Sequence, residues 1–174
     1  PEMLHCAMKY SSVAHARILR VDTSRAEQLP GVVAIITGDD VRRLTTRSGG
    51  FPEGTGSYCM AGDKVHYVGE PVAAVAAVSR HVAEDAVELI DVEFEPLAPA
   101  VNTLEAMQPG SPLVIDELGS NVVLQRQFVW GPVAAAFAQA DHVFKERFRW
   151  NRMGANPMET FGCICQWDTL SGGL

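Results

Sequence analysis

A histidine, a group of carboxylates and four cysteines are the residues of this sequence best suited to chemistry. His66 lies in the stretch "DKVHYVGEPVAAV" (63–75). A histidine can act as a general base near neutral pH. Here it alternates with Val65 and Tyr67, as residues of a strand do, so we favour a half-buried histidine with its hydrogen bonds satisfied over a catalytic base.

The carboxylates Glu84, Asp85 and Glu88 could form an acid–base pair if burial shifted one pKa. They lie in "SRHVAEDAVELIDVEFEPL" (79–97), where the apolar residues recur at helical spacing. The carboxylates occupy the opposite, wet face of that helix. We therefore expect them to solvate the helix.

The cysteines Cys6, Cys59, Cys163 and Cys165 contain no CxxC pair, so their spacing argues against a zinc or iron–sulfur site. We expect reduced, buried cysteines in a cytoplasmic protein. The glycine-rich segment 45–62 contains neither GxGxxG nor a Lys-Ser/Thr ending. It is therefore interpreted as a flexible connection and not as a nucleotide site.

Charge and hydropathy exclude two classes of partner. The net charge is −7, from 14 basic and 21 acidic residues, and the basic residues are scattered, which argues against nucleic-acid binding. Arg42 and Arg43 are expected at a solvated helix end. No apolar run reaches the ~20 residues that span a bilayer, and the first ten residues do not resemble a signal peptide.

Strands and short helices alternate along the first hundred residues. The apolar run at 32–38 predicts a strand buried on both faces, and "PVAAVAAVS" predicts another buried strand. Between the two apolar runs of the stretch around His66, Gly69 and Pro71 mark a sheet corner, because glycine allows positive φ and proline suits the first residue of a strand. Further elements are expected as strands at 3–10, 16–23, 64–69 and 91–97, and as helices at 25–29, 39–44 and 79–90.

The order strand, corner, strand, helix, strand over 64–97 predicts a compact α/β unit with a crossover helix. After Pro99 the pattern loosens into a helical turn at 103–107 and a loop. Pro132 starts a short Ala-rich helix over 131–141. Alternation predicts strands at 142–150 and 161–168, and the final Gly-Gly turn is expected to start a hairpin that the chain does not complete.

Taken in order, these segments resemble a known family. The quoted pieces are "HARILRVDTSRAEQLPGVVAIITGDDV", "AGDKVHYVGEPVAAVAAVSRHVAEDAVELIDVEFEPLAPAVNTLEAM", "GPVAAAFAQADHVFKERF" and "NPMETFG". Their order and spacing resemble the molybdopterin-binding large subunit of the xanthine oxidase/aldehyde oxidase family, which includes carbon monoxide dehydrogenase-type large chains. The resemblance implies a mixed α/β (α+β) fold: an a/b hammerhead domain at 1–118, a linker with a short helix at 119–140, and the first, β-rich strands of the molybdopterin-binding domain at 141–174.

The resemblance transfers few residues. Gly69, Glu70 and Pro71 match the sheet corner of the family, and 157–159 match a short motif that opens its cofactor domain. Pro132 departs from the usual acidic residue at that helix start. No residue aligns with the reacting centre, so we assign no catalytic, cofactor-binding or metal residue. Glu159 alone has two interpretations: support beside the cofactor, or, as we favour, a buried carboxylate that accepts backbone hydrogen bonds at a bend.

Two hypotheses remain open. The first is the N-terminal part of a molybdenum hydroxylase or dehydrogenase subunit, a cytoplasmic scaffold that is inactive alone. Its complete form would hold a molybdenum–pyranopterin cofactor (molybdopterin or its cytosine dinucleotide). Its partners would be the rest of the large subunit and iron–sulfur and FAD subunits or domains, and a homodimer is a further alternative. The second is a stand-alone, non-catalytic α/β binding or interaction domain. The unfinished hairpin favours the first.

Overall fold

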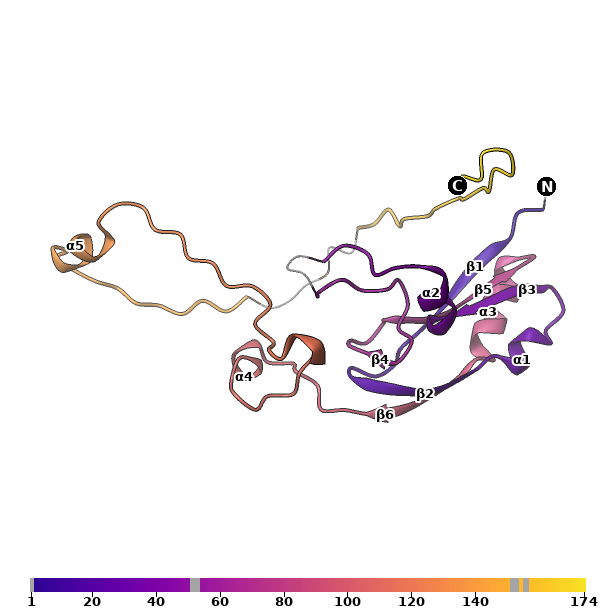
Figure 1. Ribbon diagram of the computed structural model, residues 1–174, viewed down its shortest axis with the longest axis horizontal. Helices are drawn as coiled ribbons and strands as arrows, with labels where there is room; N and C mark the ends of the chain where they lie inside the picture. The colour runs from indigo at the N-terminus through magenta and orange to yellow at the C-terminus, as the bar shows by residue number, and fades with distance from the viewer. Residues whose placement is uncertain (1, 51–53, 151–153, 155–156) are drawn as a thin grey trace. The chain divides into compact units, whose positions relative to one another are not determined.

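The computed structural model describes residues 2–50, 54–150, 154 and 157–174, and it forms two compact units, 1–127 and 128–174. The first unit is a mixed α+β fold, as predicted. It consists of two three-stranded sheets, with strand orders β1-β5-β3 and β4-β2-β6, in which every strand pair is antiparallel (Figure 1). Its strands are β1 (His5–Tyr10), β2 (Ala16–Asp22), β3 (Val32–Thr37), β4 (Lys64–Val65), β5 (Pro71–Ala77) and β6 (Asp91–Pro96).

Short helices connect these strands. Those of the first unit are α1 (Ser24–Glu27), α2 (Gly38–Leu44), α3 (Arg80–Glu88), α4 (Thr103–Ala106) and the 3-10 helix η1 (Asp116–Leu118). The start of α3 follows the sequence prediction, since the Ser79 hydroxyl accepts the backbone N–H of Val82 at 3.3 Å. At its other end, the Lys9 ammonium donates to the Val87 carbonyl at 3.2 Å, which satisfies one of the last helical acceptors.

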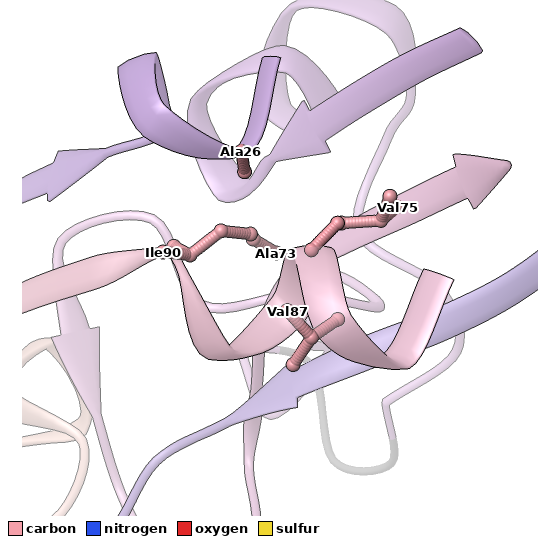
Figure 2. Close-up of a cluster of buried hydrophobic side chains, with 6 residues drawn as sticks. Ala26, Ala73, Val75, Val87 and Ile90 are labelled. Atoms are coloured by element: carbon pink, nitrogen blue, oxygen red, sulfur yellow. The ribbon is translucent and has the colours of Figure 1, made fainter. Parts of the chain in front are cut away.

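The central strand β5 is buried on both faces, as its continuous apolar sequence predicted. Ala73 and Val75 face a cluster that contains Ala26 of α1 together with Val87 and Ile90 (Figure 2). On the other face, Val72 packs in a cluster with Ala16, Ala61 and Val65, and Ala74 packs with Val41 and Met60. Because Val75 and Ile90 are at most 1% exposed, each contributes about 1.5–3 kcal/mol of burial free energy.

The prediction that β3 is buried on both faces is wrong. Val33 is 56% exposed and Ile36 is 41% exposed, because β3 is an edge strand of its sheet. Ile35, by contrast, packs against the cluster below α3. Apolar content alone therefore did not distinguish the central strand from the edge strand.

The predicted crossover unit is also wrong in its topology. The strands β5 and β6 belong to different sheets, so α3 does not connect two parallel strands of one sheet. Both edges of β5 are taken by β1 and β3, and β6 instead pairs with β2, with Val92 opposite Val21 and Phe94 opposite Ile18. Within β6 the predicted alternation holds, because Val92 and Phe94 are half-buried and the intervening glutamates are exposed.

The second unit contains one helix, α5 (Val133–Ala138), among its described residues. The strands predicted at 142–150 and 161–168 are absent from the described residues of those segments, which form only an isolated bridge between Asp168 and Gly173. Phe144, Phe148 and Trp150 are 85–91% exposed. Alternation could not form a ladder here because the described residues of this unit contain no neighbouring strand.

Candidate functional site

The candidate site is a hollow of about 380 Å³ in the first unit, beside the corner between β4 and β5. The size is within the usual range for small-molecule pockets. The segment that precedes β4, the corner itself and η1 with the residues before it all contribute to the walls. Its polar and charged walls come from Arg17, Arg42, Arg47, Ser57, Asp63, Lys64, His66, Tyr67, Glu70, Asp116 and Glu117.

The corner is confirmed and passes from one sheet to the other. Gly69 has φ +90° and the Glu70 N–H donates to the Tyr67 carbonyl at 3.3 Å, which is a tight turn with a glycine where positive φ is required. Ser11 fixes the turn from outside, because its carbonyl accepts from Gly69 and its N–H donates to the Glu70 carbonyl, both at 2.8 Å. Pro71 then begins β5, as predicted.

Glu70 closes the corner with its side chain. The carboxylate is buried, and it accepts the backbone N–H of His66 and lies 3.1 Å from His66 Nδ1. Because an ionised carboxylate only accepts, Nδ1 carries the ring proton. His66 is half-buried, as predicted, and its ring contacts the Glu70 carboxylate. Sequence analysis placed Glu70 in the corner but did not predict this contact.

Tyr67 offers no base to the hollow. Burial raises the pKa of its phenol, and the nearby Glu70 carboxylate raises it further. The phenol therefore stays protonated across the neutral range and can only exchange hydrogen bonds.

The cations around the hollow are already compensated. Lys64 Nζ lies 2.7 Å from Asp116, Arg47 lies 3.4 Å from Glu117, and Arg42 lies 3.3 Å from Asp63. The hydrogen bond from Lys64 lowers the pKa of Asp116. The pKa of Glu117 is also lowered, first by a backbone hydrogen bond and then by Arg47. Such a charge-balanced wall does not favour phosphate binding, consistent with our interpretation of 45–62.

A close approach of backbone also shapes this region. A Cβ added to Gly38 would lie 2.0 Å from the Ala61 carbonyl oxygen, so only glycine allows the start of α2 to pass the segment before β4. The described part of the 45–62 segment is itself tied back, because the Ser48 N–H donates to the Ser57 carbonyl at 2.9 Å and Arg47 lies over the Tyr58 ring.

Sequence reasoning missed His15. It is 7% exposed, and its Nδ1 lies 2.8 Å from the Ala98 carbonyl oxygen. Since a carbonyl only accepts, Nδ1 carries the proton, and Nε2 has no partner among the described residues. His15 thus ties the start of β2 to the chain after β6. The only signal in the sequence is a histidine directly before an alternating strand.

Other predicted residues do not join this site. Glu159 is exposed in the second unit and makes no hydrogen bond or ion pair with described residues, so the favoured interpretation as a buried, hydrogen-bonded carboxylate is wrong. Glu84, Asp85 and Glu88 are on the solvent face of α3, as predicted. The cysteines are unpaired, but the expectation of burial is wrong, because all four are exposed.

A metal ion held by side chains needs several ligands close together. The described part of the chain holds no group of three or more His, Cys, Asp or Glu side chains that could bind a metal ion. Glu159, the one residue considered near a cofactor, faces solvent. Within the described ranges, no helix has both the length and the apolar character to cross a membrane.

Comparisons with known proteins bear on the whole chain. Residues 1–98 match the family model of the aldehyde oxidase and xanthine dehydrogenase a/b hammerhead domain, and residues 114–174 match the molybdopterin cofactor-binding domain.

The similarity to individual relatives extends over both matched regions. The chain is 35% identical, over its whole length, to the carbon monoxide dehydrogenase large chain of Afipia carboxidovorans, and 36% identical over 95% of its length to the nicotine 6-hydroxylase large subunit of Paenarthrobacter nicotinovorans. It covers 23% and 21% of these relatives, so it spans about a fifth of their length.

Solved structures agree. Quinoline 2-oxidoreductase from Pseudomonas putida 86 superimposes with a TM-score of 0.70 at 38% identity, over 81% of this chain and 18% of that one. A Cu,Mo-containing carbon monoxide dehydrogenase gives a TM-score of 0.67 at 34% identity, over 82% and 20%. With the hammerhead model matched over more than half of its length, the chain belongs to the aldehyde oxidase and xanthine dehydrogenase family.

Proposed function

We propose that this chain is the N-terminal part of the large, molybdopterin-binding subunit of a cytoplasmic molybdenum hydroxylase or dehydrogenase. Residues 1–118 serve as its hammerhead scaffold, 119–140 as a linker, and 141–174 as the opening of the cofactor domain. The chain alone is inactive. The observation that carries the proposal is the order of the two family matches, hammerhead at 1–98 and cofactor-binding domain at 114–174.

The two units support different parts of this role. The first unit has its own buried core around β5 and a corner fixed by side-chain and backbone hydrogen bonds. The second unit has no buried side chain among its described residues. A segment of this kind is a poor place to hold a cofactor until further chain covers it.

The complete subunit would hold molybdopterin or its cytosine dinucleotide, and the cofactor would supply Lewis acidity and accept electrons. This chain contributes none of the groups that would hold it, so its own residues act by support: Glu70 and Ser11 fix the corner, and His15 fixes the end of the second sheet. The partners we propose are the rest of the large subunit, iron–sulfur and FAD chains and a second copy of the complex.

Metal analysis and turnover test the proposal. The full-length subunit, co-expressed with its neighbouring chains, is expected to contain molybdenum, iron and flavin and to reduce a dye with an aldehyde, a purine, an N-heterocycle or carbon monoxide. The 174-residue chain, purified from the same cells, is expected to contain no molybdenum and to give no turnover. Molybdenum or turnover in the isolated chain would contradict the scaffold role.

The second hypothesis, a stand-alone binding domain, would require a ligand for the hollow beside the corner. The discriminating measurement is the open reading frame after Leu174 together with the molybdenum content of its product. A product with no further cofactor-binding sequence and no molybdenum would favour the binding domain.

A further inference from the structure

Two cysteines of the second unit bring their sulfur atoms together. Cys163 Sγ and Cys165 Sγ lie 3.3 Å apart, and both side chains are exposed. The residues belong to no helix and no strand, so the local path of the chain brings the two thiols together. The observed sulfur–sulfur distance is the evidence for a converging pair.

We propose that Cys163 and Cys165 form a chelating dithiol that binds one thiophilic ion of the trivalent-arsenic class. The proposal does not depend on the molybdenum chemistry proposed above. It concerns residues that the family comparison left without any assigned role.

The geometry selects the class of ion. With sulfur–ion bonds of about 2.3 Å, two sulfurs 3.3 Å apart meet an ion at an angle of about 90°. A pyramidal trivalent ion accepts such an angle, whereas tetrahedral zinc prefers a wider one. Zinc also needs four ligands, and the described residues supply no third His, Cys, Asp or Glu to this pair. A monosubstituted arsenical brings its own remaining substituent.

The protonation state of the pair is compatible with this exchange. Hydrogen bonding with Cys163 raises the pKa of the Cys165 thiol, so Cys165 carries its own proton near neutral pH and releases it when the ion binds. In the reaction with phenylarsine oxide, two sulfur–arsenic bonds form, both thiol protons leave, and the oxide oxygen departs as water. Arsenic stays trivalent, so no oxidant is required. A disulfide between Cys163 and Cys165 would need an oxidant, and the two sulfur atoms would also have to approach to about 2.05 Å.

Titration with phenylarsine oxide tests the proposal. The chain has four cysteines, and one equivalent of arsenical should protect two of them from a thiol reagent. Removing either member of the pair, as Cys163→Ser or Cys165→Ser, should weaken binding about 100-fold, because the second bond is no longer intramolecular. A monothiol wash should leave the wild-type adduct intact and strip the adduct from both variants.

The matched controls are Cys6→Ser and Cys59→Ser, which remove the other two exposed cysteines and should retain wild-type binding. The same titration on the full-length subunit completes the test, with peptide mapping to locate the adduct. Equal affinity in the wild type and the pair variants, loss of the adduct in a control variant, or an unreactive pair in the full-length subunit would each overturn the proposal.

Discussion

The two units contain similar alternating sequence, but only one converts it into structure. In the first unit, β6 alternates Val92 and Phe94 with glutamates and pairs with β2. In the second, 142–150 alternates aromatic and charged residues, yet it forms no strand and leaves Phe144 85% exposed. The two segments differ in whether a neighbouring strand is present. Alternation of apolar and polar residues gives a segment one apolar face, but the segment becomes a stable strand only when an adjacent strand exchanges backbone hydrogen bonds with it.

The largest expected effect comes from a charge placed in the buried core that only the first unit has. Val75→Asp places a carboxylate on β5, where the native side chain is 0% exposed, and should destabilise the first unit by more than about 4 kcal/mol because no partner compensates the charge. Urea unfolding followed by circular dichroism measures the change in free energy.

Phe148→Asp is the matched control, because Phe148 is 91% exposed in the second unit. The substitution should change the unfolding free energy by less than about 0.5 kcal/mol. A loss of several kcal/mol in this variant would show that the second unit has a core of its own and would break the comparison.

Sequence alone predicted the elements whose signals are local. The capped helix α3, the buried run of β5 and the Gly69–Pro71 corner are all read from neighbours within a few residues. The family, too, could be predicted from ordered segments. These features depend on short-range chemistry that the sequence displays directly.

Pairing and burial between distant segments could not be predicted in this way. Nothing local in β5 says that both of its edges are occupied, so the crossover to β6 was wrong, and nothing in β3 marks it as an edge. The hydrogen bond from His15 to Ala98 spans 83 positions, and Cys163 and Cys165 are exposed in a segment that forms no strand ladder among its described residues. Such outcomes depend on which segments, distant in the sequence, pack or pair with one another in the folded chain.

The corner carboxylate gives the second prediction. Glu70→Ala removes the acceptor of the His66 backbone N–H, and a donor left without a partner in this half-buried corner should lower the unfolding free energy by about 1–3 kcal/mol. Glu70→Gln retains one carbonyl acceptor, so its loss should be smaller. Chemical denaturation of the three proteins measures the order.

Glu159→Ala is the control from the other unit, since that residue is exposed and makes no hydrogen bond or ion pair with described residues. It should leave the unfolding free energy unchanged. If Glu70→Ala proves no more destabilising than Glu159→Ala, the carboxylate does not hold the corner, and its fixation depends on Ser11 alone.

A pH experiment sharpens the comparison further. At the start of α2, Asp40 accepts the Thr37 N–H at 2.9 Å and its hydroxyl at 2.8 Å, and these hydrogen bonds lower the pKa of Asp40 below 3.8. A carboxyl whose folded pKa is lowered stabilises the protein above its unfolded pKa and loses that contribution as the pH falls through the folded value. Asp40→Ala should therefore be less stable than the wild type by about 1 kcal/mol near pH 6, with a difference that shrinks below about pH 4.

Asp168 is the counterpart in the second unit, where the Ser171 hydroxyl and then the Leu170 N–H lower its pKa. Because this turn belongs to no core, Asp168→Ala should leave cooperative unfolding unchanged at every pH. Parallel acid titrations of the two variants check both statements. A constant gap between Asp40→Ala and the wild type from pH 6 to pH 2 would contradict the role of the ionised carboxylate.

The smallest expected effect concerns the surface of α3. The Arg80 guanidinium lies 2.7 Å from Glu84, with side chains that are 78% and 51% exposed, and a pair this exposed contributes little to stability. Arg80 is also the first residue of α3, where the helix dipole disfavours a cation by a similar amount. Arg80→Ala removes both contributions together, so the unfolding free energy should change less than in any of the destabilising variants described above. Because both contributions are screened by salt, the small difference should vanish in 1 M NaCl. A larger, salt-independent loss would mean that the aliphatic part of Arg80 packs on the first unit, and surface contacts would then join the core in separating the two units.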